Sequence, residues 1–75
     1  MLFLIEYARD QGQIISFKAF QDEDSILAKN ERLDLELDLN RRGVEREVVL
    51  LDAENEAALR RTHRRYFENL MELVS

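Results

Sequence analysis

The first twenty residues constrain the fold most, because they contain two strand-like segments on either side of a short turn. Residues 2–8 (LFLIEYA) and 13–20 (QIISFKAF) are rich in aromatic and β-branched side chains. Asp10 and Gly12, which lie between them, are residue types that favour turns. The pattern predicts a β-hairpin. The first segment is apolar on both sides, as in a central strand, and the second alternates like an edge strand.

The segment 22–43 (DEDSILAKNERLDLELDLNRRG) is compatible with two structures. Leucines and acids alternate with a period of two at 32–39, which is typical of a strand. A helix is favoured because leucine is a good helix former and no β-branched residue follows the single isoleucine. Acids at the start and arginines at the end suit the helix dipole, and Gly43 suits a helix end. The alternative makes 32–39 and 44–51 a second hairpin.

The remaining sequence predicts one more strand, at 44–51, and a long helix over 54–73 with Asp52 or Asn55 as its N-cap. The order is then β-β-α-β-α. A strand that follows a helical crossover lies parallel to the strand before it, so the hairpin places the first strand in the middle, in the order 2-1-3. We therefore predict an α+β fold, a split β-α-β unit with both helices on one face of a three-stranded sheet. The second-hairpin alternative gives ββββα.

The length and composition of the chain exclude several classes of protein. With 75 residues it is expected to form a single small domain, 1–75, whose stability is marginal without association. The absence of cysteine excludes disulfides and thiolate metal sites, and we expect no cofactor or metal. The net charge of −5 disfavours nucleic acid and anionic membranes as partners. The apolar start is too short for a signal peptide or membrane span, which suggests a soluble cytoplasmic protein.

The stretch RRTHRRYF, residues 60–67, combines four arginines, the only histidine and two aromatic residues. At helical spacing the aromatic residues fall on the apolar side and the arginines on the opposite side. We call these arginines the arginine face: Arg60, Arg61, Arg64 and Arg65. A nucleic-acid site needs exposed rings among its cations, so a solvated or acid-paired face is favoured over a patch for an acidic protein partner and over phosphate binding. His63 lies on the apolar side and is expected to be a core or boundary residue rather than a catalytic one.

Residues that could support catalysis are scarce. The chain has no cysteine nucleophile and no glycine-rich phosphate loop, and none of its serines lies in a GxSxG motif. Its many carboxylates look solvated, whereas acid–base catalysis needs one with a shifted pKa. We therefore expect a protein that is not an enzyme.

A helix over 22–41 would carry apolar residues on two opposite sides. One side, the Leu33 stripe, consists of Ile26, Leu33 and Leu37, and the other, the Leu35 stripe, of Ala28, Leu35 and Leu39. Two stripes indicate that the helix contacts something besides its own domain. We predict a protein–protein interaction module, either a homodimer or a partner of another protein. It would associate through the Leu35 stripe or through a sheet face without helices. The alternative is weak nucleic-acid or phosphate binding by the arginine face.

Overall fold

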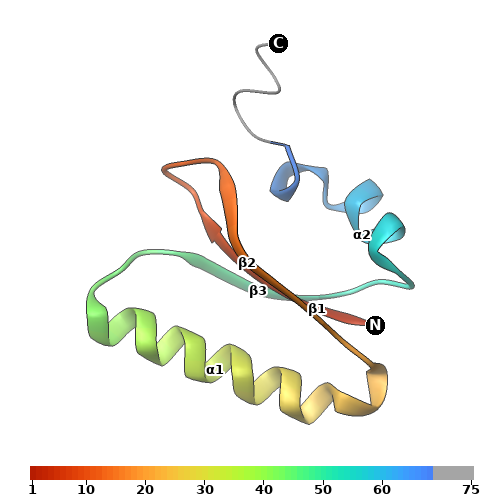
Figure 1. Ribbon diagram of the computed structural model, residues 1–75, viewed down its shortest axis with the longest axis horizontal. Helices are drawn as coiled ribbons and strands as arrows, with labels where there is room; N and C mark the ends of the chain where they lie inside the picture. Colours follow the sequence, from red (N-terminus) through yellow and green to blue (C-terminus); the bar gives the residue numbers. More distant parts are fainter. Residues whose placement is uncertain (69–75) are drawn as a thin grey trace.

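The computed structural model describes residues 1–68 and has an α+β fold (Figure 1). The strands are β1 (Leu2–Ala8), β2 (Gln13–Phe20) and β3 (Glu47–Asp52), and the helices are α1 (Ser25–Arg42) and α2 (Glu56–Thr62). The sheet order is β2-β1-β3, with β1 antiparallel to both neighbours. The predicted split β-α-β topology with the order 2-1-3 is therefore confirmed.

The β1–β2 hairpin turns at residues 9–12, where Gly12 has a φ of 65° and its N–H donates to the Ala8 carbonyl over 2.8 Å. Glu6 lies opposite Ser16 and Tyr7 lies opposite Ile14. This shift in register leaves Ile15 as an extra residue on β2, and it is 44% exposed. The bulge turns β2, so Ile14 rather than Ile15 packs with the core beside β1.

The ambiguous segment 22–43 is helical, so the alternative hairpin of 32–39 with 44–51 is wrong. A 3₁₀ turn at Asp22–Asp24 leads into α1, and Gly43 ends it in the left-handed conformation, with a φ of 67°. The Val44 N–H donates to the Leu39 carbonyl over 3.0 Å, which satisfies one carbonyl of the last helical turn. The strand predicted from residue 44 begins only at Glu47.

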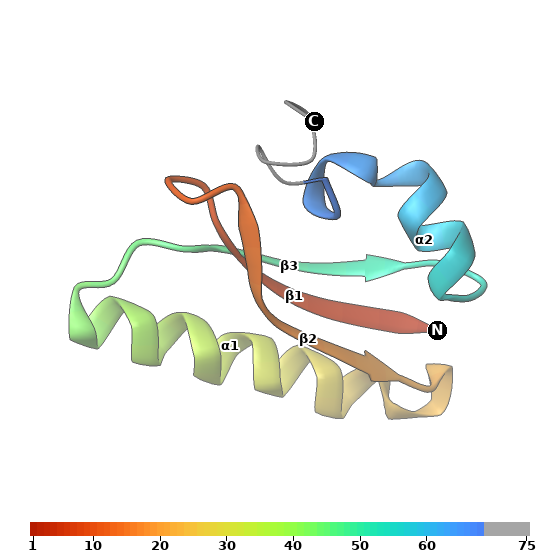
Figure 2. The same ribbon diagram turned by 45° about the horizontal axis from the view of Figure 1, so that its top comes forward.

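The two helices lie on opposite faces of the sheet, not on one face as predicted (Figure 2). Side chains alternate across β1, so its two faces build two separate cores. On one face Leu4 packs with Phe20 of β2 and with Ala28 of α1. The other face packs against α2 and the residues after it: Phe3, Ile5 and Tyr7 with Leu59 and Tyr66. Both sheet faces are covered. The predicted association through a sheet face without helices is therefore wrong.

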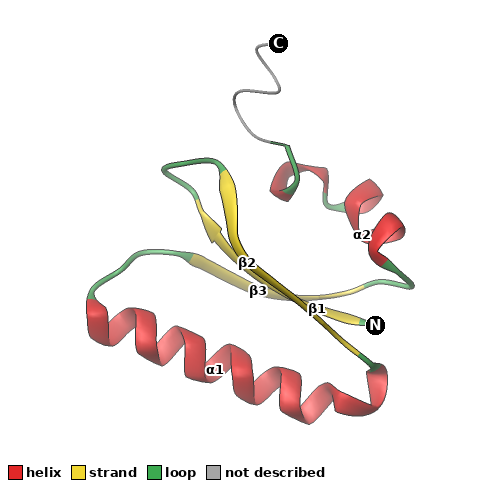
Figure 3. Cartoon of the chain, in the orientation of Figure 1, coloured by secondary structure: helices red, strands yellow, loops and turns green. Residues whose placement is uncertain are grey.

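The C-terminal helix is much shorter than the predicted 54–73 (Figure 3). Asn55 is its N-cap as predicted and accepts the Ala58 N–H over 2.8 Å, but α2 ends at Thr62. The Thr62 hydroxyl donates to the Ala58 carbonyl over 3.0 Å, a bond that competes with the backbone pattern. After His63 the chain forms a 3₁₀ turn, Arg64–Tyr66. The predicted helical residues 69–73 lie outside the described part of the chain.

Candidate interaction surface

Helix α1 turns the Leu35 stripe toward the sheet. Ala28 is 0% and Leu39 4% exposed, and Leu35 is half-buried. The methyl side chain of Ala28 lets the helix approach Leu4 and Phe20 closely, and all three belong to one apolar core. The stripe predicted to bind a partner therefore faces the sheet, and Ala28 and Leu39 are buried in the chain's own core.

The outward side of α1 carries the Leu33 stripe. Ile26 is 74% exposed, Leu33 52% and Leu37 56%. Leu27, which belongs to neither predicted stripe, is 51% exposed and borders the same side. Leu27 follows Ile26 and is rotated from it by about 100° around the helix axis, which predicts a position at that border. Four large aliphatic side chains of one helix thus face away from the sheet.

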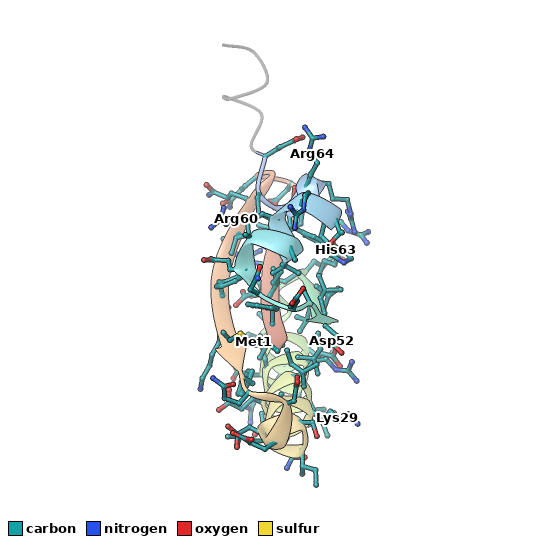
Figure 4. All side chains as sticks on the ribbon, turned by 90° about the vertical axis from the view of Figure 1, so that its right-hand side faces the viewer. Met1, Lys29, Asp52, Arg60, His63 and Arg64 are labelled. Atoms are coloured by element: carbon teal, nitrogen blue, oxygen red, sulfur yellow. The ribbon has the colours of Figure 1, made fainter. Side chains whose placement is uncertain are left out.

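The arginine face lies on the opposite side of the molecule from α1. Figure 4 shows Arg60 and Arg64 at the α2 end and Lys29 at the α1 end. Arg60 contacts Glu56 at 3.2 Å, and its guanidinium lies 4.4 Å from the centroid of the Phe67 ring. Arg64 contacts Glu68, four residues further along the chain, at 3.5 Å. Within residues 1–68 the ion pairs of these arginines involve no acid of α1, because the sheet separates the two helices.

Arg65 takes part in the most connected charge cluster of the described chain. It contacts Glu47 of β3 at 3.1 Å, and Arg9 of the hairpin contacts the same carboxylate at 2.9 Å. Arg65 also donates to the Tyr66 hydroxyl over 2.6 Å. The pKa of Glu47 is lowered, mainly by the hydrogen bond from Arg9 and to a smaller extent by those from Arg65. Burial, and then the negative charge of Glu47, raises the pKa of the Tyr66 phenol.

Of this cluster only Arg65 was among the residues singled out from the sequence, and a second polar cluster on β1 was not predicted. Glu6 is only 8% exposed, although it lies in the central strand. The Ser16 hydroxyl donates to one of its oxygens over 3.2 Å, and the Nε of Arg46 lies 3.4 Å from the other. The signal available in the sequence was that Glu6 is the only charged residue within an otherwise apolar strand. Both clusters have local partners and join strands, which indicates a structural role.

His63 is half-buried beside the core and follows the last residue of α2. Its ring centroid lies 6.5 Å from that of Tyr66, in a tilted arrangement. Within residues 1–68 no group of three or more histidine or acidic side chains is arranged to hold a metal ion. The described helices also include none that is long and apolar enough to cross a membrane.

Comparison with known proteins adds no relative from which a role could be transferred. No family model matches the chain, and no curated protein or solved structure is significantly similar to it.

Proposed function

We propose that the chain is a protein–protein interaction module rather than an enzyme, and that it self-associates through the outward side of α1. One observation carries the proposal: four large aliphatic side chains of this helix are more than half exposed. Single exposed leucines are common on protein surfaces, but a contiguous group of them usually marks an interaction site.

The energetics favour covering this surface. Burying apolar area contributes roughly 25 cal/mol per Å², so a few leucine-sized side chains supply several kcal/mol toward association. Helix α1 is already ordered by its packing on the sheet, so a partner would not have to offset the entropy of forming the helix. The Leu33 stripe therefore presents a preorganised apolar ridge.

The test is the solution mass of the chain across a dilution series from about 1 μM to about 1 mM, by sedimentation velocity. We expect a monomer–dimer equilibrium that Leu37→Glu shifts to the monomer. Glutamate is a good helix former and lies four residues before Arg41, so this variant keeps the helix. Ile15→Glu, which removes an exposed aliphatic side chain from β2, is the matched control and should leave the dimer unchanged. A wild-type chain that stays monomeric throughout the series would contradict the proposal.

The alternative, weak binding of nucleic acid or phosphate by the arginine face, has less support. Arg60, Arg64 and Arg65 each lie within 4 Å of a glutamate, so a phosphate would have to displace carboxylates that are already in place. The rings of Tyr66 and Phe67 are buried or half-buried, which leaves little surface for stacking bases. Binding of labelled single- and double-stranded nucleic acid at low salt, followed by fluorescence anisotropy, decides this alternative. Micromolar binding that weakens steeply with added salt would support it.

A further inference from the structure

The outward side of α1 has the residue spacing of a coiled-coil seam. Its positions follow one another at intervals of four and three: Ile26, Asn30, Leu33, Leu37 and Asn40. In heptad notation, Ile26, Leu33 and Asn40 occupy d positions, while Asn30 and Leu37 occupy a positions. All five are exposed and lie opposite the residues that contact the sheet. A second helix could therefore pack along this seam without disturbing the monomer.

The charges beside the seam indicate which way the second helix runs. Lys29 and Glu36 occupy g positions, and Asp34 and Arg41 occupy the e positions five residues after them. In a parallel, in-register pair each g side chain meets the e side chain five residues further along the other helix. This arrangement places Lys29 opposite Asp34 of the second copy and Glu36 opposite Arg41 of the second copy. Both contacts are attractive, and two-fold symmetry repeats each of them.

Of these four side chains, Glu36 already contacts Arg32 of its own helix at 3.9 Å, and the other three are available for contacts with a second copy. Among residues 1–68, Lys29 and Asp34 take part in no ion pair, and both are exposed. Arg41 contacts Asp38 at 3.1 Å, but Arg42 contacts the same carboxylate at 3.0 Å and could keep it paired. Arg41 is 77% exposed in its side chain and free to turn toward a second copy.

An antiparallel pair fits the charges less well. It would bring e positions next to e positions and g next to g. When the whole seam overlaps, Lys29 would still lie beside Glu36 of the second copy, but Asp34 would lie beside Asp34 of the second copy, a repulsion that the parallel pair lacks. A polar Asn30 layer also suits a parallel dimer, because asparagine at an a position meets its own copy and fixes the register.

From this complementarity we infer that the partner of α1 is a second copy of the same chain, docked as a parallel, in-register helix pair. The inference rests on the proposed function and adds its geometry. The seam spans little more than two heptads, below the area of a standard interface, so the dimer should dissociate in the micromolar range.

Charge reversal with rescue tests the arrangement by sedimentation velocity. Lys29→Glu and Asp34→Lys, made singly, should each weaken the dimer about tenfold, because each turns two symmetric attractions into repulsions. The double variant restores both attractions in the parallel pair and should dimerise within about threefold of wild type. All sites are exposed, so circular dichroism should show unchanged folding.

Oxidative cross-linking gives an independent reading, since the chain contains no cysteine. In a parallel, in-register pair both Ile26→Cys and Asn40→Cys place the new thiol next to its own copy, so both variants should form covalent dimers. Asp10→Cys, on the exposed hairpin, is the control for random collisions. In an antiparallel pair the two thiols of either variant would lie at opposite ends of the seam and would not cross-link above the control.

The outcomes separate the arrangement from the function. Rescue by the double variant together with both cross-links supports the parallel pair. A wild-type dimer whose charge reversals are not rescued, or whose end positions fail to cross-link, overturns the parallel arrangement and leaves self-association standing. A wild-type chain that remains a monomer overturns both.

Discussion

Leu33 and Leu35 are two residues apart on α1 and lie on opposite sides of the helix. Leu33 is 52% exposed, whereas Leu35 is half-buried and lines a groove between α1 and β2 together with Leu4 and Phe17. The same residue type thus faces the sheet at one position and the solvent at the other. This contrast defines which side of α1 is available to a partner.

Replacing each of these leucines by alanine separates the two roles, because both changes have the same small effect on helix propensity. Leu35→Ala should lower the free energy of unfolding by about 1–2 kcal/mol, since it removes partly buried methyl groups. Leu33→Ala should change it by less than about 0.5 kcal/mol. Urea denaturation at low micromolar concentration, where association is minor, provides both values. Equal losses of unfolding free energy in the two variants would mean that α1 does not pack the Leu35 side against the sheet in preference to the Leu33 side.

The two stripes could be read from the sequence, but the side that faces the sheet could not. Each stripe offers aliphatic side chains at helical spacing, so periodicity alone does not rank them. The choice depends on how closely the helix backbone can approach the strands. Ala28 permits that approach and is 0% exposed, while Ile26 at the start of the other stripe is 74% exposed. A small residue in a stripe was the available sign that it packs against a flat sheet.

The sheet order was predictable for a different reason. The hairpin and the right-handed crossover leave only one simple place for β1, between β2 and β3. The placement of α2 was not fixed by these rules. Because β1 is apolar on both faces, each face needs a cover, and α2 with Tyr66 provides the second one. Applying that requirement to β1 would have predicted helices on both faces.

A double-mutant cycle tests the placement of the C-terminal segment on this second face. The Tyr7 and Tyr66 rings meet edge to face, with centroids 5.2 Å apart and planes at 89°. Replacing each by leucine, singly and together, should give a coupling energy of about 1 kcal/mol. Leu4→Ala combined with Tyr66→Leu is the control, because Leu4 lies on the α1 face, and these effects should add. Coupling in the control pair but not in the tyrosine pair would contradict the two-faced arrangement.

Gly43 ends α1 with a φ of 67°, a conformation that side chains with a Cβ adopt at a cost. No atom lies within 4 Å of the position that a Cβ would occupy, so the cost is one of backbone conformation and not of crowding. Gly43→Ala should therefore lower the free energy of unfolding by about 1 kcal/mol. Gly43→Asn should cost less, because asparagine tolerates the left-handed region better. Thermal denaturation of the three proteins ranks them, and an alanine variant as stable as wild type would contradict this account.

The charge cluster around Glu47 predicts how the stability of the fold depends on pH. Its pKa is lowered in the folded chain by the hydrogen bond from Arg9 and then by those from Arg65. A carboxyl group with a lowered folded pKa stabilises the native state fully above its unfolded value, about 4.3. This contribution is lost as the pH falls from there through the lower, folded pKa. The wild-type chain should therefore become less stable toward acid over that interval.

Glu47→Gln removes the titrating group but keeps the size of the side chain. At neutral pH it should lower the free energy of unfolding by about 1 kcal/mol, a modest value because both arginines are largely exposed. Below the folded pKa of Glu47 the difference from wild type should shrink, since the wild-type carboxyl is then also neutral. Urea denaturation at a series of pH values measures this convergence. The variant should also lower the pKa of the Tyr66 phenol, which the charge of Glu47 helps to raise, and ultraviolet titration of the tyrosines reports that shift. Parallel stability curves with an unchanged phenol titration would mean that Glu47 does not interact with these neighbours in solution.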